Sequence, residues 1–231
     1  MTSSPVTPLS TSDPEAFLHH TPEQIAAARD WLAVRDPVLA RAHAATPPVL
    51  WRKRPGGFSG LIKMVVEQQV SIAAAASIWR RFEEGLGQVT PANVLSREEA
   101  ELKLFGLSAP KARYARGIAL AVAEGQIDFD AIDRMEDDAA VSALTALKGV
   151  GRWTAETYLM FCHGRLDVFP AGDVALQEAL RTASGQADRL TEKALYERAT
   201  EWRPYRGVAA HLLWAYYGAL KRGEAQPPTI A

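Results

Sequence analysis

Apolar residues recur every three or four positions along most of the chain, the spacing that places them on one face of an α-helix. The clearest run extends from Phe58 to Gly85, with apolar positions at Leu61, Val65, Val66, Val70, Ala73, Ala74 and Ile78. The same spacing and the capping residues predict further helices over 22–34, 137–148, 152–162, 174–183, 191–200 and 205–221. Ser96 with Glu99 has the form of a capping box. Strand-like alternation is nearly absent, so we predict an all-α protein of about ten helices.

Residues at the start of the chain have a different character. The segment 1–22 is rich in Ser, Thr and Pro, which predicts a disordered or loosely ordered tail. Pro47-Pro48 and Pro55-Gly56-Gly57 are helix breakers that flank a short basic and aromatic stretch. The remaining length suits one large domain or two small ones that share a cleft.

Composition and charge exclude some classes of protein and leave others open. One cysteine, Cys162, allows no internal disulfide and no cysteine cluster for zinc or iron–sulfur binding. No run of apolar residues is long enough to span a bilayer and no secretory signal is evident, so we expect a cytoplasmic protein. The net charge of −1 becomes +2 without residues 1–23, which hold three acids and no base. Charge alone therefore does not decide for or against a nucleic-acid partner.

The segment Leu144–Ala155 carries the most informative motif. Gly149 and Gly151 flank one apolar residue and predict a tight turn between two helices, because glycine adopts positive φ without steric cost. Such a turn exposes the backbone N–H groups at the start of the second helix, where they and the helix dipole can bind a phosphate. Leu147 and Val150 would anchor the turn in the core. A plain helix C-cap followed by a new helix is the alternative.

Asp173 follows Gly172 and precedes a helical apolar pattern, so it is expected at a helix N-terminus. A simple N-cap is one interpretation. The other uses the same physics: N–H donors and the helix dipole keep a carboxylate ionised in a partly buried cleft. Such a carboxylate can stabilise an oxocarbenium-like sugar or activate a water molecule. Asp167 is a competing candidate that lies before the Pro-containing turn.

These motifs resemble a known family. Leu147 to Ala155 resembles the helix–hairpin–helix of base-excision DNA glycosylases, with Lys148 where that family usually has proline, and 168–173 resembles the loop that carries its aspartate. The segments 65–71, 106–114, 202–206 and 211–214 are similar to the 3-methyladenine DNA glycosylase II family, over roughly 58–221. The resemblance implies an all-α core over 23–231, with subdomains at about 58–172 and at 23–57 plus 173–222 that flank a DNA-binding cleft.

The resemblance also assigns roles to individual residues. Asp173 would be catalytic, and the pocket for the substrate base would contain Trp153, Trp214, Tyr158 and Tyr205. Gln69 would fill the gap left by a flipped base. The other DNA contacts would come from Gln68, Lys148, Gly149, Gly151, Arg152 and Thr154. Backbone carbonyls of Thr145, Leu147 and Val150 could hold a sodium or potassium ion, and no other cofactor is expected.

The family's bifunctional members have a lysine nucleophile at the position of Trp153, so no Schiff base and no strand cleavage are expected here. The resemblance therefore implies a monofunctional DNA glycosylase of base excision repair, a monomer that acts on double-stranded DNA and leaves an abasic site. Its expected substrates are alkylated bases such as 3-methyladenine and 7-methylguanine, whose positive charge suits the indole faces of Trp153 and Trp214. A non-catalytic helix–hairpin–helix protein that binds DNA damage and a glycosylase for oxidised or mismatched bases are the alternatives.

Overall fold

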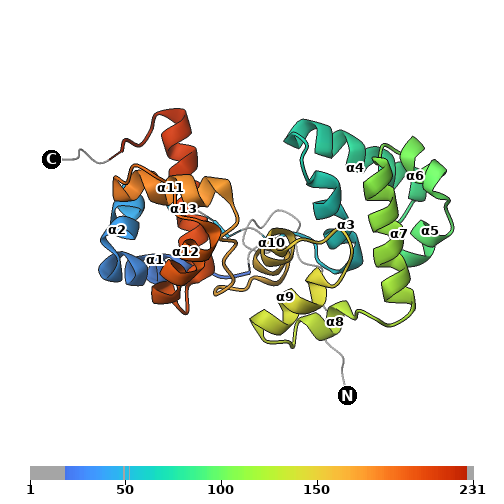
Figure 1. Cartoon of the computed structure of the whole chain (residues 1–231), viewed down its shortest axis with the longest axis horizontal. Coiled ribbons are helices and arrows are strands. Elements are labelled where there is room, and N and C mark those ends of the chain that lie inside the picture. The colour runs from blue at the N-terminus through green and yellow to red at the C-terminus, as the bar shows by residue number, and fades with distance from the viewer. Residues whose placement is uncertain (1–18, 49, 52, 228–231) are drawn as a thin grey trace, which may run out of the picture.

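The computed structural model describes residues 19–48, 50–51 and 53–227, and within these residues every regular element is a helix (Figure 1). The all-α class that the sequence predicts is confirmed. The first elements are α1 (Pro22–Arg35), α2 (Pro37–Ala44), α3 (Gly57–Glu67), α4 (Ile72–Leu86), α5 (Pro91–Leu95), α6 (Glu99–Leu104) and α7 (Ala109–Ala123). Those that follow are α8 (Phe129–Ile132), α9 (Asp137–Thr145), α10 (Arg152–His163), α11 (Val174–Ser184), α12 (Glu192–Ala199), the short 3-10 helix η2 (Thr200–Trp202) and α13 (Arg206–Arg222).

The helices form two groups on either side of α10 (Figure 1). In one group α1 packs on α2, and α13 packs on α1, α2 and α11. In the other, α7 packs on α3, α5 and α6, and α3 packs on α4. Helix α10 contacts α9 and α3 directly. The group formed by α1, α2 and α11–α13 thus combines the two ends of the chain, and we call it the terminal lobe; we call α3–α9 the central lobe.

Buried apolar side chains from both lobes form one continuous cluster. Helix α10 contributes to it along most of its length, through Ala155, Tyr158, Leu159, Met160 and Cys162. The segment before α3 is joined to the same helix: the indole of Trp51 donates to the Met160 carbonyl at 3.1 Å and is 1% exposed. Helix α10 packs on α3 and α9 of the central lobe, and its Glu156 accepts a hydrogen bond from Tyr196 of α12, so side chains at its N-terminal end are placed where the lobes meet.

Several sequence predictions need correction at their ends or in their continuity. The run 58–85 is two helices rather than one, because the backbone turns at Gln68–Ser71 and Ser71 starts α4 as its N-cap. The capping box near residue 96 belongs to Glu98 and Glu101, not to Ser96 and Glu99. The predicted helix 137–148 ends at Thr145.

Most of the predicted N-terminal tail, residues 1–18, lies outside the described residues. Its last part does not fit that prediction, because the rings of His19 and His20 hydrogen-bond to the carbonyls of Phe161 and Gly164 at 3.0 and 2.6 Å. Thr21 then caps α1 through a capping box with Gln24. Among the described residues, no helix is long and apolar enough to cross a membrane.

Candidate functional site

A cavity of about 250 Å³ opens where α10 meets the two lobes. Its lining residues are Arg54, Met64, Glu67, Trp153, Thr157, Phe161, Asp173 and Trp214. Three of them lie four residues apart on α10, so one face of this helix forms a wall. Asp173 and Trp214 come from the terminal lobe, whereas Met64 and Glu67 come from α3. The site therefore needs both lobes.

Asp173 is the N-cap of α11 and lines the cavity. Its Oδ1 accepts hydrogen bonds from the backbone N–H groups of Ala175 and Leu176 at 2.8 and 3.1 Å. Its Oδ2 accepts from the indole N–H of Trp153 at 2.8 Å. The side chain is therefore an N-cap and part of the cavity at once. The positive end of the helix dipole and three N–H donors converge on this one carboxylate.

Aromatic rings form much of the cavity wall. The indole of Trp153 is 41% exposed, which is unusual for a large apolar ring. Trp214 on α13 stacks with Phe161 of α10, with ring centroids 5.7 Å apart and an interplanar angle of 28°. The structure thus brings together Asp173, which is predicted to be catalytic, with Trp153 and Trp214, two of the four residues predicted for the pocket.

The other two predicted pocket residues do not line this cavity. Tyr158 is completely buried on a different face of α10, where its hydroxyl donates to the Gly57 carbonyl at 3.3 Å and burial raises its pKa. Five residues from Trp153 correspond to about 140° around a helix, which turns the ring away. Tyr205 packs edge-to-face on Trp31 of α1, with centroids 5.3 Å apart. The structure therefore does not bring these two tyrosines into the cavity that Asp173 lines.

Asp167, the competing candidate for the catalytic acid, has a structural role, because both of its carboxylate oxygens accept hydrogen bonds from Arg206. Its Oδ1 accepts from the backbone N–H and the Nε of Arg206 at 3.1 and 3.0 Å, and its Oδ2 accepts from Nη2 of the same arginine at 3.0 Å. These bonds fix the start of α13. Asp167 does not line the cavity.

The predicted turn between α9 and α10 is a hairpin with buried anchors. Leu147 and Val150 are 8% and 4% exposed, and the Val150 N–H donates to the Leu147 carbonyl at 3.0 Å. Gly149 has φ +95°, and a Cβ atom there would lie 2.3 Å from the ring of Tyr114. Glycine is required at this position for both reasons. Gly151 then starts α10 without any side-chain cap, so the first N–H groups of the helix are open to a ligand.

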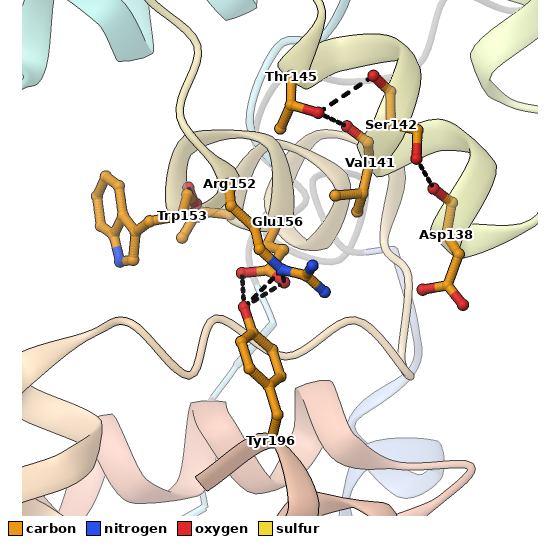
Figure 2. Close-up of polar contacts among 9 residues, drawn as sticks. Asp138, Val141, Ser142, Thr145, Arg152, Trp153, Glu156 and Tyr196 are labelled. Carbon is orange, nitrogen blue, oxygen red and sulfur yellow. Dashed lines mark hydrogen bonds and ion pairs between the residues drawn. The ribbon is translucent and has the colours of Figure 1, made fainter. Parts of the chain in front are cut away.

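The three predicted cation ligands line one hollow beside this hairpin. Thr145, Leu147 and Val150 share it with the exposed side chain of Lys148 and with Gly149. The Thr145 hydroxyl donates to the Val141 and Ser142 carbonyls at 2.8 and 3.1 Å (Figure 2), and the predicted ion ligand is the carbonyl of Thr145 itself. Carbonyl oxygens are ligands that hard cations accept, so the donor set fits.

The loop Gln68–Ser71 lies between α3 and α4 and borders the same hollow. Gln69 is exposed and has φ +56°, the one positive φ of a non-glycine residue among those described. Gln68 donates from Nε2 to the Gly149 carbonyl at 3.3 Å and to the Thr154 hydroxyl at 2.9 Å. Gln68 is therefore tied to the hairpin, while Gln69 projects from the surface.

Arg152 and Glu156 form a polar cluster with Tyr196 of α12 (Figure 2). The Tyr196 hydroxyl donates to Glu156 Oε1 and Oε2 at 2.7 and 2.9 Å, and Arg152 Nε donates to Glu156 Oε1 at 2.9 Å. Glu156 is 2% exposed, and burial raises its pKa to about 7. This cluster joins the N-terminal turn of α10 to the terminal lobe. No motif in the sequence marks Glu156 for this role.

Comparison with known proteins identifies the family. Residues 62–204, more than half of the chain, match the family described as HhH-GPD superfamily base excision DNA repair protein. The chain belongs to this superfamily. A relative, DNA-3-methyladenine glycosylase 1 of Schizosaccharomyces pombe, is 30% identical over 71% of this chain and 72% of its own length. The chain spans only 62% of the Bacillus subtilis relative YfjP, to which it is 27% identical.

Two solved structures of the superfamily superpose closely. A DNA-3-methyladenine glycosidase from Bacillus halodurans has a TM-score of 0.75 and 32% identity, covering 93% of this chain and 94% of that one. The Schizosaccharomyces pombe enzyme Mag1, in complex with abasic DNA, has a TM-score of 0.71 and 27% identity, covering 81% and 95%. The resemblance expected from the sequence is confirmed.

Several residues that line the cavity of this protein were not predicted from the sequence. Thr157 and Phe161 follow Trp153 at helical spacing, so that spacing was a signal for both. Met64 looks like any core residue of α3. Arg54 and Glu67, which pair at 2.5 Å, are brought together from separate segments, and no local pattern indicates this.

Proposed function

We propose that this protein is a monofunctional DNA glycosylase that flips alkylated bases out of double-stranded DNA and hydrolyses their glycosidic bonds. The observation that carries the proposal is the meeting of Asp173 with Trp153 and Trp214 in one cavity of about 250 Å³. The names of the relatives, DNA-3-methyladenine glycosylases, support the same activity.

The reaction needs a carboxylate beside the sugar of the flipped nucleotide. As the glycosidic bond breaks, its electron pair leaves with the base and positive charge develops on the sugar, where Asp173 stabilises it. The oxygen of a water molecule then bonds to the sugar carbon, and the water proton passes to the carboxylate or to solvent. The products are the free base and an abasic site. None of the cavity's lining residues is a lysine, which favours hydrolysis over Schiff-base chemistry.

The aromatic walls favour a cationic base. Purines alkylated at N3 or N7 carry a formal positive charge, and an indole face attracts a cation by about 0.5–2 kcal/mol. Such a base is already a good leaving group, so it requires no strong general acid. This economy agrees with a cavity in which Asp173 is held by N–H donors.

The DNA-binding surface we propose runs from the Gln68–Ser71 loop to the hairpin. Gln69 would enter the gap left by the flipped base, helped by the exposed apolar side chains of Val70 and Ile72, which are 37% and 91% exposed. Phosphate would bind the N–H groups at the start of α10 and the side chains of Lys148 and Arg152. A sodium or potassium ion on the carbonyls named above would supply positive charge beside that phosphate. The protein would act as a monomer.

A base-release assay on a panel of alkylated duplexes tests the proposal. We expect release of 3-methyladenine and 7-methylguanine, with abasic sites that become strand breaks only after alkali or heat. Asp173→Asn should abolish release while retaining duplex binding. Binding without release by the wild-type protein would instead support a non-catalytic damage-binding protein, and nicking of DNA that contains 8-oxoguanine would support the oxidised-base alternative.

A further inference from the structure

Lys111 makes two hydrogen bonds that its own helix does not need. Its Nζ donates to the carbonyls of Val66 and Gln68 at 2.8 and 2.7 Å. These carbonyls belong to the last turn of α3 and to the loop that carries Gln69. Burial lowers the pKa of Lys111 below its ordinary value. The ammonium group is therefore partly withdrawn from water and bonded to the backbone of another element.

The position of Lys111 within α7 makes this contact more informative. It is the third residue of α7, where a cation opposes the positive end of the helix dipole. At the C-terminal end of α3, in contrast, the same charge meets the negative end of that helix's dipole. The lysine is thus unfavourable for the helix that carries it and favourable for the neighbouring loop.

One turn further along α7, Tyr114 contacts the hairpin. Residues three apart on a helix share a face, so Lys111 and Tyr114 point in similar directions. The ring of Tyr114 packs so closely on Gly149 that a Cβ atom there would lie within 2.3 Å. Gln68 completes the link through its bonds to Gly149 and Thr154. One face of α7 thus contacts both the loop and the hairpin.

We infer that Lys111 is a positioning residue for base flipping: it fixes the Gln68–Ser71 loop relative to the hairpin, so that Gln69 enters the duplex at a set distance from the bound phosphate. The inference rests on the proposed function. A non-glycine residue at positive φ is strained and persists only where its surroundings impose it. The bonds from Lys111 to the carbonyls on the near side of Gln69 provide such surroundings.

The test compares Lys111→Met with wild type on two duplexes that contain the same 7-methylguanine. In one duplex the lesion is paired with cytosine, and in the other it lies opposite an abasic site. Flipping is cheapest where the pair is already broken, so the second duplex needs little help from Gln69. We expect single-turnover base release by the variant to fall at least about tenfold on the paired duplex and less than about threefold on the other. Lys103→Met, an exposed lysine of α6, is the matched control and should change neither rate.

Other outcomes separate the inference from its alternatives. If Lys111 only contacts phosphate, both rates fall alike and the slope of log K against log salt decreases by about one, which would overturn the inference. Equal rates for variant and wild type on both duplexes would also overturn it. Absence of base release by the wild-type protein would refute the proposed function instead. Should Lys111→Met fail to fold, Gln68→Met, which cuts the link from the loop to the hairpin, should give the same selective loss on the paired duplex.

Discussion

The carboxylates of Asp173 and Glu156 accept hydrogen bonds from neighbouring residues of one helix, and their surroundings give them different roles. Asp173 receives the indole N–H of Trp153, whereas Glu156 pairs with Arg152. Figure 2 shows Trp153 pointing away from the cluster of Arg152, Glu156 and Tyr196. Successive helical residues are about 100° apart, so one turn of α10 serves the cavity on one side and the contact between lobes on another.

The contrast lies in what each carboxylate leaves free. Asp173 accepts N–H bonds and still lines an open cavity. Glu156 is enclosed, and both its oxygens accept from a tyrosine that belongs to the terminal lobe. A carboxylate with an open side can act on a substrate, while one whose bonds are all internal joins two parts of the fold. Environment rather than residue type separates the roles, as in enzymes where two acids divide the chemistry between them.

The largest expected effect comes from removing each charge in turn. Asp173→Asn should lower base release at least about 100-fold, because the charge that stabilises the transition state is lost. Its free energy of unfolding should change by less than about 1 kcal/mol, since asparagine is also a good N-cap. Glu156→Gln should leave release within about threefold of wild type. Single-turnover release of 7-methylguanine and urea unfolding measure the two quantities, and a similar loss of release in both variants would contradict the division of roles.

Glu156 and His211 of α13 should make opposite contributions to the pH dependence of the free energy of unfolding. Burial raises the pKa of Glu156 from 4.5 to about 7, so between these values the folded protein holds a proton that the unfolded chain has lost. The free energy of unfolding contributed by Glu156 therefore falls as pH rises through this window. Burial lowers the pKa of His211 from 6.5 to about 4, so here the unfolded chain holds the extra proton and stability rises with pH.

The two contributions oppose each other between about pH 4.5 and 6.5, each at most about 3 kcal/mol. Glu156→Gln should therefore reveal the rise due to His211, and His211→Gln should reveal the fall due to Glu156. Urea unfolding at pH 4.5, 5.5 and 6.5 measures this as the difference between variant and wild type, so that groups common to both cancel. A Glu156→Gln curve parallel to that of wild type would show that Glu156 does not titrate in this window.

A smaller effect is expected from Tyr196→Phe, which removes one hydroxyl and keeps the ring. The variant should lose about 1–2 kcal/mol of stability, because Glu156 then lacks a buried donor. The guanidinium of Arg152, whose Cζ lies 4.5 Å from the ring centroid, keeps its stacking contact. Since the tyrosine hydrogen bond lowers the pKa of Glu156, its loss should raise that pKa. The pH range over which the free energy of unfolding falls should then extend above pH 7. Urea unfolding at pH 7 and 8 measures the loss of stability and the pH range over which stability falls. Tyr217→Phe, at a tyrosine of α13 outside the cluster, is the control. An unchanged pH range in Tyr196→Phe would contradict the prediction.

The sequence was sufficient for elements whose signals are local. Helix α10 begins at the predicted Arg152, and Asp173 caps α11 as expected, because glycines and capping residues act within a few positions. The break at Gln68–Ser71 was not predictable in this way. Apolar spacing continues through it, and the bonds that hold it come from Lys111, more than forty residues away in sequence. Asp36-Pro37, a capping pair that starts α2, was a usable signal that was overlooked.

The candidate site shows the same limit. Asp173, Trp153 and Trp214 were found from motifs, but the motifs carried no information on which face of α10 each neighbour occupies. Tyr158 was therefore assigned to the pocket although it lies in the core. Glu156 was missed because an acidic residue near a helix start is normally exposed, and only tertiary packing shows that it is buried.

The smallest expected effect concerns the preference of the cavity beside α10 for a positively charged base. Trp214→Leu keeps an apolar wall but removes a π-face, so it should cost about 1 kcal/mol, or roughly fivefold in kcat/KM, on cationic 7-methylguanine. Release of neutral hypoxanthine should change by less than about twofold. The ratio of the two rates is the measurement, and Glu156→Gln is the matched control, because a carboxylate enclosed by Arg152 and Tyr196 should leave the ratio unchanged. If Glu156→Gln altered the ratio and Trp214→Leu did not, charge recognition would lie at the cluster of Glu156 rather than at the cavity. The division of roles between the two carboxylates would then be wrong.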